Sequence, residues 1–118
     1  MDSIENVARD FTAMLRAGEF LAAGERYWAA EVASLEPAGE EPAAIGIVAV
    51  RARTERRLRH QRIEDIAIDG PFVTGNQFAL FLDMTVVDRT SGTAAPFSEI
   101  AVFTVSDARI TEERFFHD

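Results

Sequence analysis

The fold is decided by one stretch of the chain, Glu99-Ile100-Ala101-Val102-Phe103-Thr104-Val105-Ser106-Asp107-Ala108-Arg109-Ile110. Its first half is rich in β-branched and aromatic residues, which favour a strand. Asp107 and Ala108 stand where the two central residues of a tight hairpin belong, and a second strand-forming run continues to position 117. The stretch therefore predicts two antiparallel strands joined by a two-residue turn.

Further strands and three helices extend outward from this hairpin. Apolar runs separated by turn residues predict strands over residues 63–69, 78–88, 96–105 and 110–117. Upstream, apolar residues recur at three- and four-residue steps, which predicts helices over 2–17, 20–30 and 46–61, with a brief strand over 32–36. Because helices precede strands instead of alternating with them, we expect an α+β fold with a meander of about four antiparallel strands.

Length and composition exclude several classes of protein. The 118 residues fit one domain, residues 1–118, and 47% apolar with 27% charged residues is typical of a globular protein. No apolar run approaches about 18 residues and the first six residues do not resemble a signal peptide, so we expect no membrane contact and a cytoplasmic location. A net charge of −8 argues against nucleic acid as a partner. Cys is absent and all 12 basic residues are Arg, which excludes thiolate chemistry, Schiff bases and Walker-type phosphate loops.

Several segments resemble one known family. They are residues 28–37, the Gly46-Ile47 opening of the third helix, Gly70-Pro71-Phe72-Val73-Thr74-Gly75-Asn76-Gln77-Phe78-Ala79, and the hairpin stretch quoted above. In this order they resemble the SnoaL-like family of the nuclear transport factor 2-like superfamily, which includes ketosteroid isomerases and polyketide cyclases, over nearly the whole chain. The hairpin departs from the family's usual Asp-Gly-Lys-Ile or Asp-Gly-Arg-Ile, because Ala108 replaces the glycine best suited to a positive φ.

The resemblance implies a cone-shaped barrel, in which a curved antiparallel sheet wraps around the three N-terminal helices and leaves a pocket at the wide end. It also implies a homodimer formed through the outer face of the sheet, a small apolar organic ligand and no cofactor. Activities in this superfamily range from isomerase, cyclase, dehydratase and epoxide hydrolase to noncatalytic binding. The fold does not choose among them, so the site residues must.

Strand pairing in the hairpin sorts the candidate residues by face. A regular ladder pairs Ala101 with Arg114 and Glu99 with Phe116. In similar proteins the Ile after the turn points into the cone, so Glu99, Arg114 and Asp118 would point inward with it. A β-bulge would move the side chains farther from the turn to the opposite face of the sheet.

Two carboxylates are candidate catalytic residues. Glu99 interrupts an apolar strand, and burial in an apolar pocket would raise its pKa toward the range that suits a general base or acid. The alternative for Glu99 is an ion pair with Arg114 or a solvated position. Asp118 resembles the Asp at the end of the last strand in many SnoaL-like sequences, where it is a candidate base; as the last residue it could instead fray into water.

Tyr27 and Arg114 are candidates for stabilising an oxyanion. A phenol near a carboxylate can stabilise an enolate, as in ketosteroid isomerase, a superfamily relative, so the argument for Tyr27 is one of analogy. The alternative is structural: Tyr27 and Trp28, the single Tyr and Trp, would anchor the second helix in the core with their polar tips near the surface.

Other side chains are candidates for ligand binding. Glu36 ends the brief strand at the expected pocket mouth, although a loop carboxylate near other acids is often solvated. Asp83 breaks an apolar strand and would be a rival base if it faced inward, but both faces of that strand are largely apolar, so its direction stays open. Four aromatic residues complete the expected wall: Phe11, Trp28, Phe103 and Phe116.

An arginine cluster occupies the third helix, where six of the 12 Arg lie within residues 51–62. We interpret it mainly as a solvated face that balances the acidic loop before it, with binding of an anionic ligand as the alternative. The two His, His60 and His117, lack the spacing of metal ligands, so we expect no metal site.

The sequence thus predicts a small-molecule pocket protein, and the first hypothesis for its activity is a cofactor-free isomerase or cyclase that moves a proton next to a carbonyl. The alternative is a noncatalytic ligand-binding or dimeric assembly module, whose cavity is filled by Phe11, Phe78, Phe103 and Phe116. Whether the chain is an enzyme stays open at this point.

Overall fold

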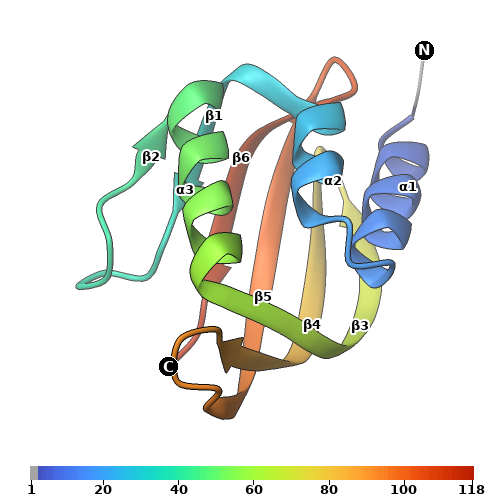
Figure 1. Cartoon of the computed structure of the whole chain (residues 1–118). Coiled ribbons are helices and arrows are strands. Elements are labelled where there is room, and N and C mark those ends of the chain that lie inside the picture. Colours follow the sequence, from blue (N-terminus) through green and yellow to red (C-terminus); the bar gives the residue numbers. More distant parts are fainter. Residues whose placement is uncertain (1–2) are drawn as a thin grey trace.

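A computed structural model describes residues 3–118 (Figure 1). The three helices are α1 (Ile4–Arg16), α2 (Phe20–Tyr27) and α3 (Ile47–His60). The strands of the described chain are β1 (Trp28–Leu35), β2 (Ala44–Ile45), β3 (Gln61–Thr74), β4 (Gln77–Asp88), β5 (Ala94–Ser106) and β6 (Arg109–Phe116). The helices cover one face of a single sheet, so the predicted α+β class is confirmed.

Helix α1 shows why the helical predictions were accurate. The Ser3 side chain accepts a hydrogen bond from the backbone N–H of Asn6 at 3.2 Å, which caps the first turn. The helix buries one stripe of side chains, and Gly18, with φ of 79°, follows its C-terminus. The Asp2 side chain is equally suited by type to cap this helix, but Asp2 lies outside the described residues. None of the helices formed by residues 3–118 is long and apolar enough to cross a membrane.

The second helix is shorter than predicted, because the chain leaves it at Tyr27 and enters β1 directly at Trp28. The predicted helix ran to residue 30 and the predicted strand began at 32. Strand β1 pairs with β6 in parallel and with β2 in antiparallel fashion, and Trp28, Ala29 and Val32 are buried. These pairings and burial outweigh the helical preference of the alanines in this segment.

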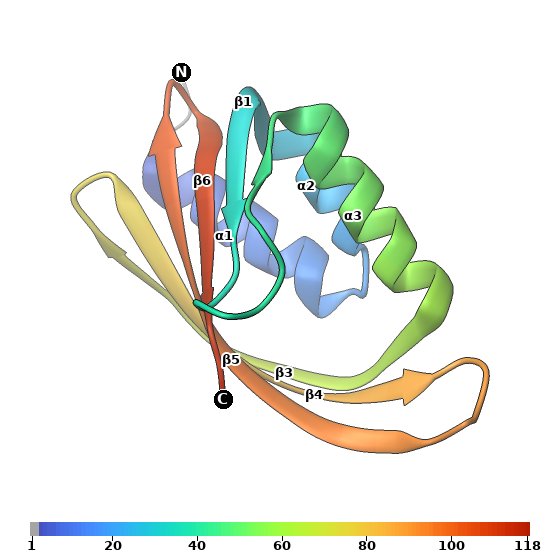
Figure 2. The ribbon, with the colours of Figure 1, turned by 90° about the vertical axis from the view of Figure 1, so that its left-hand side faces the viewer.

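The sheet has the order β2-β1-β6-β5-β4-β3 and curves strongly around the helices (Figure 2). Strands β3 to β6 form the predicted antiparallel meander. Strand β3 continues through Gly70-Pro71, where an interruption was predicted, with a register shift between Asp69 and Phe72. The sheet does not close into the expected barrel, since β2 and β3 remain its two edges.

One end of the cone is closed by aromatic packing, and we call it the closed end. Phe103 stacks on Phe78 with ring centroids 4.8 Å apart and meets Phe11 edge-on at 4.9 Å. All three rings are at most 4% exposed, near the β3–β4 and β5–β6 turns. The helices and sheet are therefore joined at this end by a dense core.

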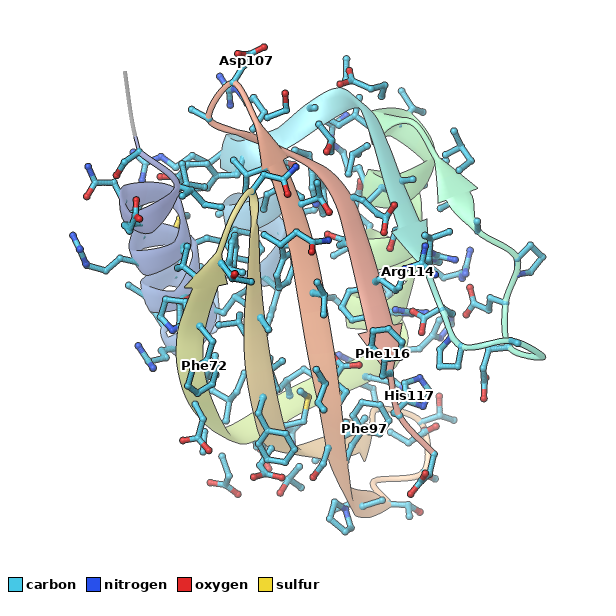
Figure 3. The ribbon with its side chains drawn as sticks, turned by 180° about the vertical axis from the view of Figure 1, so that it is seen from behind. Phe72, Phe97, Asp107, Arg114, Phe116 and His117 are labelled. Atoms are coloured by element: carbon cyan, nitrogen blue, oxygen red, sulfur yellow. The ribbon has the colours of Figure 1, made fainter. Side chains whose placement is uncertain are left out.

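A β-bulge in the hairpin changes the direction of every side chain farther along β6. Val105 pairs with Ile110 as predicted, but Thr104 then pairs with Glu112, so Thr111 is an extra residue. The predicted pairs of Ala101 with Arg114 and Glu99 with Phe116 are wrong. Instead, Phe103 pairs with Glu113, Ala101 with Phe115 and Ile100 with Phe116. The bulge turns Glu113, Phe115 and His117 toward the helices and leaves Arg114 and Phe116 on the outer face, which Figure 3 views directly.

Candidate functional site

A cavity of about 520 Å³ lies at the other end of the cone, which we call the open end. It is bounded by the concave face of the sheet, by α3 and by the ends of α1 and α2. Its apolar wall includes Leu15, Leu58, Ile63, Leu82, Met84 and Val86, and its aromatic wall includes Phe11, Phe20, Trp28, Phe97, Phe103 and Phe115. The volume is in the range of small-molecule sites. The cavity is not filled by Phe11, Phe78, Phe103 and Phe116 as the assembly-module alternative required.

Glu99 projects from β5 into this cavity, opposite Leu82 on β4. Within residues 3–118 no group donates a hydrogen bond to its carboxyl group, and the predicted alternative, an ion pair with Arg114, is not formed. Burial, followed by the charge of Glu36, raises the pKa of Glu99 to about 7, although His117 and Arg57 oppose the shift. Glu99 is therefore about half ionised at neutral pH.

Glu113 is a second buried carboxyl group on the wall, and it differs from Glu99 in having partners. The Trp28 indole N–H donates to its Oε1 at 2.8 Å, and the Ser34 hydroxyl donates to its Oε2 at 2.9 Å. Burial raises the pKa of Glu113, while the two donors act against that rise. The sequence did not single out Glu113 because a regular ladder places it on the outer face.

Glu36 directly follows β1 at the rim of the cavity, where its side chain is 6% exposed. Its Oε1 accepts a hydrogen bond from Arg57 at 2.7 Å, and its Oε2 lies 3.4 Å from the His117 ring. The ion pair with Arg57 and the low exposure exclude the solvated alternative for Glu36.

Arg53 and Arg57 lie in the cavity wall, so the interpretation of the cluster mainly as a solvated face does not hold for these two. Arg53 is buried and donates to the carbonyl oxygens of Ser34 at 2.7 Å and Pro42 at 2.8 Å. Arg57 also lies 3.5 Å from Glu41. Both guanidinium groups thus bind the chain's own anions and carbonyls instead of facing empty space.

His117 lies directly after β6, with its ring edge against Phe97 at a centroid distance of 5.0 Å (Figure 3). Its Nδ1 lies 3.2 Å from the carbonyl oxygen of Asp118. This hydrogen bond, with a further contribution from Glu36, raises the pKa of His117. The sequence placed His117 on the outer face for the same reason as Glu113.

The remaining predicted site residues lie away from the cavity. Tyr27 is buried beside α1 and donates to Asp10, which agrees with its structural alternative. Asp83 faces outward from β4 and accepts a hydrogen bond from Ser98.

Arg114 pairs with Glu112 at 3.1 Å on the outer face, and Phe116 is exposed there because of the bulge. Asp118 is exposed at the end of the chain and is not part of the wall. Of the predicted residues, Glu99, Glu36, Phe11, Trp28 and Phe103 line the cavity.

Metal ligands do not gather in the described chain. Within residues 3–118 no group of three or more His, Asp or Glu side chains is placed to hold a metal ion.

A family model for the SnoaL-like domain matches residues 3–117. The chain belongs to the SnoaL-like family. A solved SnoaL-like structure from Mesorhizobium loti, a candidate polyketide cyclase, is 33% identical, with 98% of this chain and 100% of that chain covered and a TM-score of 0.90. Comparison with curated proteins finds no significant match.

Two more distant structures show the SnoaL-like fold alone. A candidate SnoaL-like polyketide cyclase from Jannaschia sp. CCS1 is 16% identical, with 100% of this chain and 90% of that chain covered and a TM-score of 0.82. An LEH-like epoxide hydrolase from M. tuberculosis is 17% identical, with 95% of this chain and 82% of that chain covered and a TM-score of 0.76. The fold is therefore shared by proteins whose names indicate different chemistry.

Proposed function

We propose that this SnoaL-like protein binds a small, mostly apolar carbonyl compound and that Glu99 moves a proton within it, without a cofactor. One observation carries the proposal: Glu99 stands on the wall of an open apolar cavity with no hydrogen-bond donor among the described residues. A carboxyl group in such a place is available to a ligand, whereas Glu113, in the same wall, is bound to Trp28 and Ser34.

The chemistry follows from the state of Glu99. As a carboxylate it would take a proton from the carbon next to the carbonyl, and as the acid it would return that proton to another position of the bound molecule. A pKa of about 7 leaves both forms populated at neutral pH. Such a transfer is the step that an isomerase or an aldol-type cyclase requires, and the polyketide cyclase name of the Mesorhizobium loti relative supports this class.

The proposal can be tested without knowing the natural substrate. The probe is 5-nitrobenzisoxazole, a small neutral aromatic compound whose C–H proton is taken by a base while its N–O bond breaks to give a coloured nitrophenolate. We expect Glu99→Gln to lower kcat/KM by about 100-fold or more, which is the usual contribution of a positioned general base. We expect the wild-type rate to rise with pH around a midpoint near 7, because the base must be ionised.

Asp83→Asn is the matched control, because it removes a carboxylate from the outer face of the neighbouring strand. Equal rates for wild type and Glu99→Gln would sink the role of Glu99. Probe binding without any elimination by the wild-type protein would assign the chain to the alternative function, a noncatalytic ligand-binding module.

We also propose that two copies associate through the outer face of the sheet. Phe81 pairs with Ile100 and Ile100 with Phe116, so these three side chains form a row across β4, β5 and β6. They are 37%, 46% and 49% exposed, which is a large apolar strip for the surface of a small monomer. Sedimentation at micromolar concentration should give a dimer that Ile100→Glu converts to a monomer; a monomeric wild-type protein would refute the assignment.

A further inference from the structure

We propose that the ligand of the open-end cavity carries a positively charged amine, which Glu99 binds in its carboxylate form. The inference rests on the proposed function only in taking this cavity as the ligand site. It names the ligand class, an organic ammonium compound with an apolar body, and does not depend on any proton transfer to carbon.

The first step is that each cationic side chain that residues 3–118 place on the wall is already engaged. Arg57 binds Glu36 at 2.7 Å, and Arg53 donates to two backbone carbonyls. His117 lies between the Asp118 carbonyl and Glu36. A ligand carboxylate or phosphate that approached Arg57 or His117 would therefore lie beside the Glu36 carboxylate, which already binds both groups and repels a second anion. Near Arg53 it would compete with two backbone carbonyl oxygens.

The second step is the balance of charge around the cavity. Its wall contains five Glu, at positions 36, 40, 41, 99 and 113, against two Arg and one His. Among them Glu99 is the side chain that is partly buried and without a hydrogen-bond donor in the described chain. An ammonium group would supply the missing donor and the missing charge together, whereas a neutral ligand would supply neither charge nor an equally strong hydrogen bond.

The third step is independent of the acids and concerns the aromatic wall. The described wall includes six aromatic side chains, among them Trp28, which contacts Glu113, and Phe97, which contacts His117. Aromatic rings attract cations through the negative face of the ring, most strongly where water is excluded. The same rings accommodate an apolar body, so the wall suits a molecule that combines both parts.

The inference predicts a pH dependence of binding with a definite sign. The groups that act on Glu99 are Glu36 after β1, Arg57 on α3, Glu113 on β6 and His117 after β6. A bound ammonium favours the Glu99 carboxylate, so the free protein must release a proton from Glu99 on binding. Affinity for an amine should rise about tenfold from pH 6 to pH 8, as the ionised fraction of a group with a pKa near 7 does. Loss of the His117 proton over this range acts in the same direction.

Three probes of one shape but different charge test the inference: 2-phenylethylamine, 2-phenylethanol and phenylacetate. Trp28 is the single Trp and lines the cavity, so its fluorescence reports binding, with calorimetry as the second readout. At pH 8 we expect the amine to bind at least about tenfold more tightly than the alcohol, and phenylacetate to bind most weakly. Only the amine should gain affinity between pH 6 and pH 8.

Glu99→Gln should reduce amine binding to near the level of the alcohol and leave only the smaller pH dependence that His117 contributes, while Asp83→Asn should change neither. Circular dichroism confirms that each variant is folded. Equal affinity for the amine and the alcohol, tighter binding of phenylacetate, or no binding of any probe at about 10 mM, the weak end of measurable affinity, would overturn the inference. Selective binding of the amine without elimination of 5-nitrobenzisoxazole would support the ligand class and refute the proposed catalysis. Elimination without a preference for the amine would support the catalysis and overturn the ligand class.

Discussion

The closed and open ends of the cone use the same strand for opposite purposes. On the inner face of β5, Phe103 is 2% exposed between Phe11 and Phe78, and four residues earlier Glu99 faces an open cavity. The closed end has the packing of a protein core, and the open end keeps space and a carboxyl group without a donor. The difference indicates that stability is concentrated at one end, which allows the other to keep an unfavourable arrangement of charge.

The sharpest way to break this comparison is to remove one aromatic ring from each end. Phe78→Ala should lower the free energy of unfolding by about 3–5 kcal/mol, because Phe78 is buried against Phe103 and does not line the cavity, so that its removal leaves a void among rings that cannot collapse onto it. Phe97→Ala, at the open end, should cost less than about 1.5 kcal/mol, because that ring already borders empty space. Urea unfolding of the two variants measures both values, and similar losses would contradict the division of the cone into two ends.

A second comparison concerns the two buried carboxyl groups of the open end. Glu113→Ala removes the acceptor of the Trp28 and Ser34 donors, and we expect a loss of about 2–3 kcal/mol from the free energy of unfolding. Glu99→Ala removes a group with no donor and should cost less than about 1 kcal/mol at pH 7. Urea unfolding at this pH decides, and a larger loss for Glu99→Ala would show that Glu99 has a partner in solution.

The pH dependence of stability sharpens the difference further. The folded state holds the Glu99 proton up to a pKa of about 7, whereas the unfolded chain releases it near the ordinary value of 4.5. The folded state therefore binds more protons between these values, and Glu99 makes stability fall as the pH rises through this window, by about 3 kcal/mol.

Glu99→Gln should remove that fall. The free energy of unfolding of the variant should therefore increase relative to that of the wild type between pH 4.5 and pH 8. His117 loses a stabilising proton over an overlapping range in both proteins, so the difference between the two unfolding curves reports Glu99. Parallel curves would show that the Glu99 carboxyl group is not desolvated.

The smallest expected effect lies at the tip of the closed end. Asp107 and Ala108 form the predicted two-residue turn, and Ala108 adopts a φ of 60°, which glycine accepts more readily than alanine. Ala108→Gly should raise the free energy of unfolding by about 0.5–1 kcal/mol, with no effect on ligand binding. Thermal unfolding checks the gain, and a loss would mean that the Ala108 methyl group contributes more through packing than its backbone costs.

Much of the fold could be predicted because it follows from local patterns. The apolar stripe of α1, the turn at Asp107-Ala108 and the long apolar run of β4 each indicate one structure. Strand β1 could not be placed as well, because its alanines suit a helix and its pairing with β6 is a long-range contact. The order of segments was sufficient to indicate the family.

The site was predicted only in part, and the bulge is the physical reason. Glu99 lies on β5, the strand that does not contain the extra residue. Its inward direction therefore followed from the alternation with Ala101 and Phe103. On β6, Phe115 and Phe116 are adjacent aromatic residues that satisfy the inner face equally well, so the sequence pattern gives no sign of which register is formed. Glu113 and His117 were missed for this reason, and Arg114 was assigned to the wrong face.

The bulge at Thr111 also has an evolutionary consequence. Strand β6 and the residue after it contain two sets of candidate wall residues in alternate positions: Glu112, Arg114 and Phe116 in one, and Glu113, Phe115 and His117 in the other. The single extra residue shifts the register of the strand by one position, and the second set therefore faces the cavity. A descendant that regularised this hairpin at constant strand length would put Arg114 in the place of Phe115 and Phe116 in the place of His117 on the cavity wall in one event, so that a guanidinium group replaces an imidazole where point mutations would need several steps. Insertions and deletions near this turn are thus a direct route by which a fold of this kind can acquire a new ligand preference.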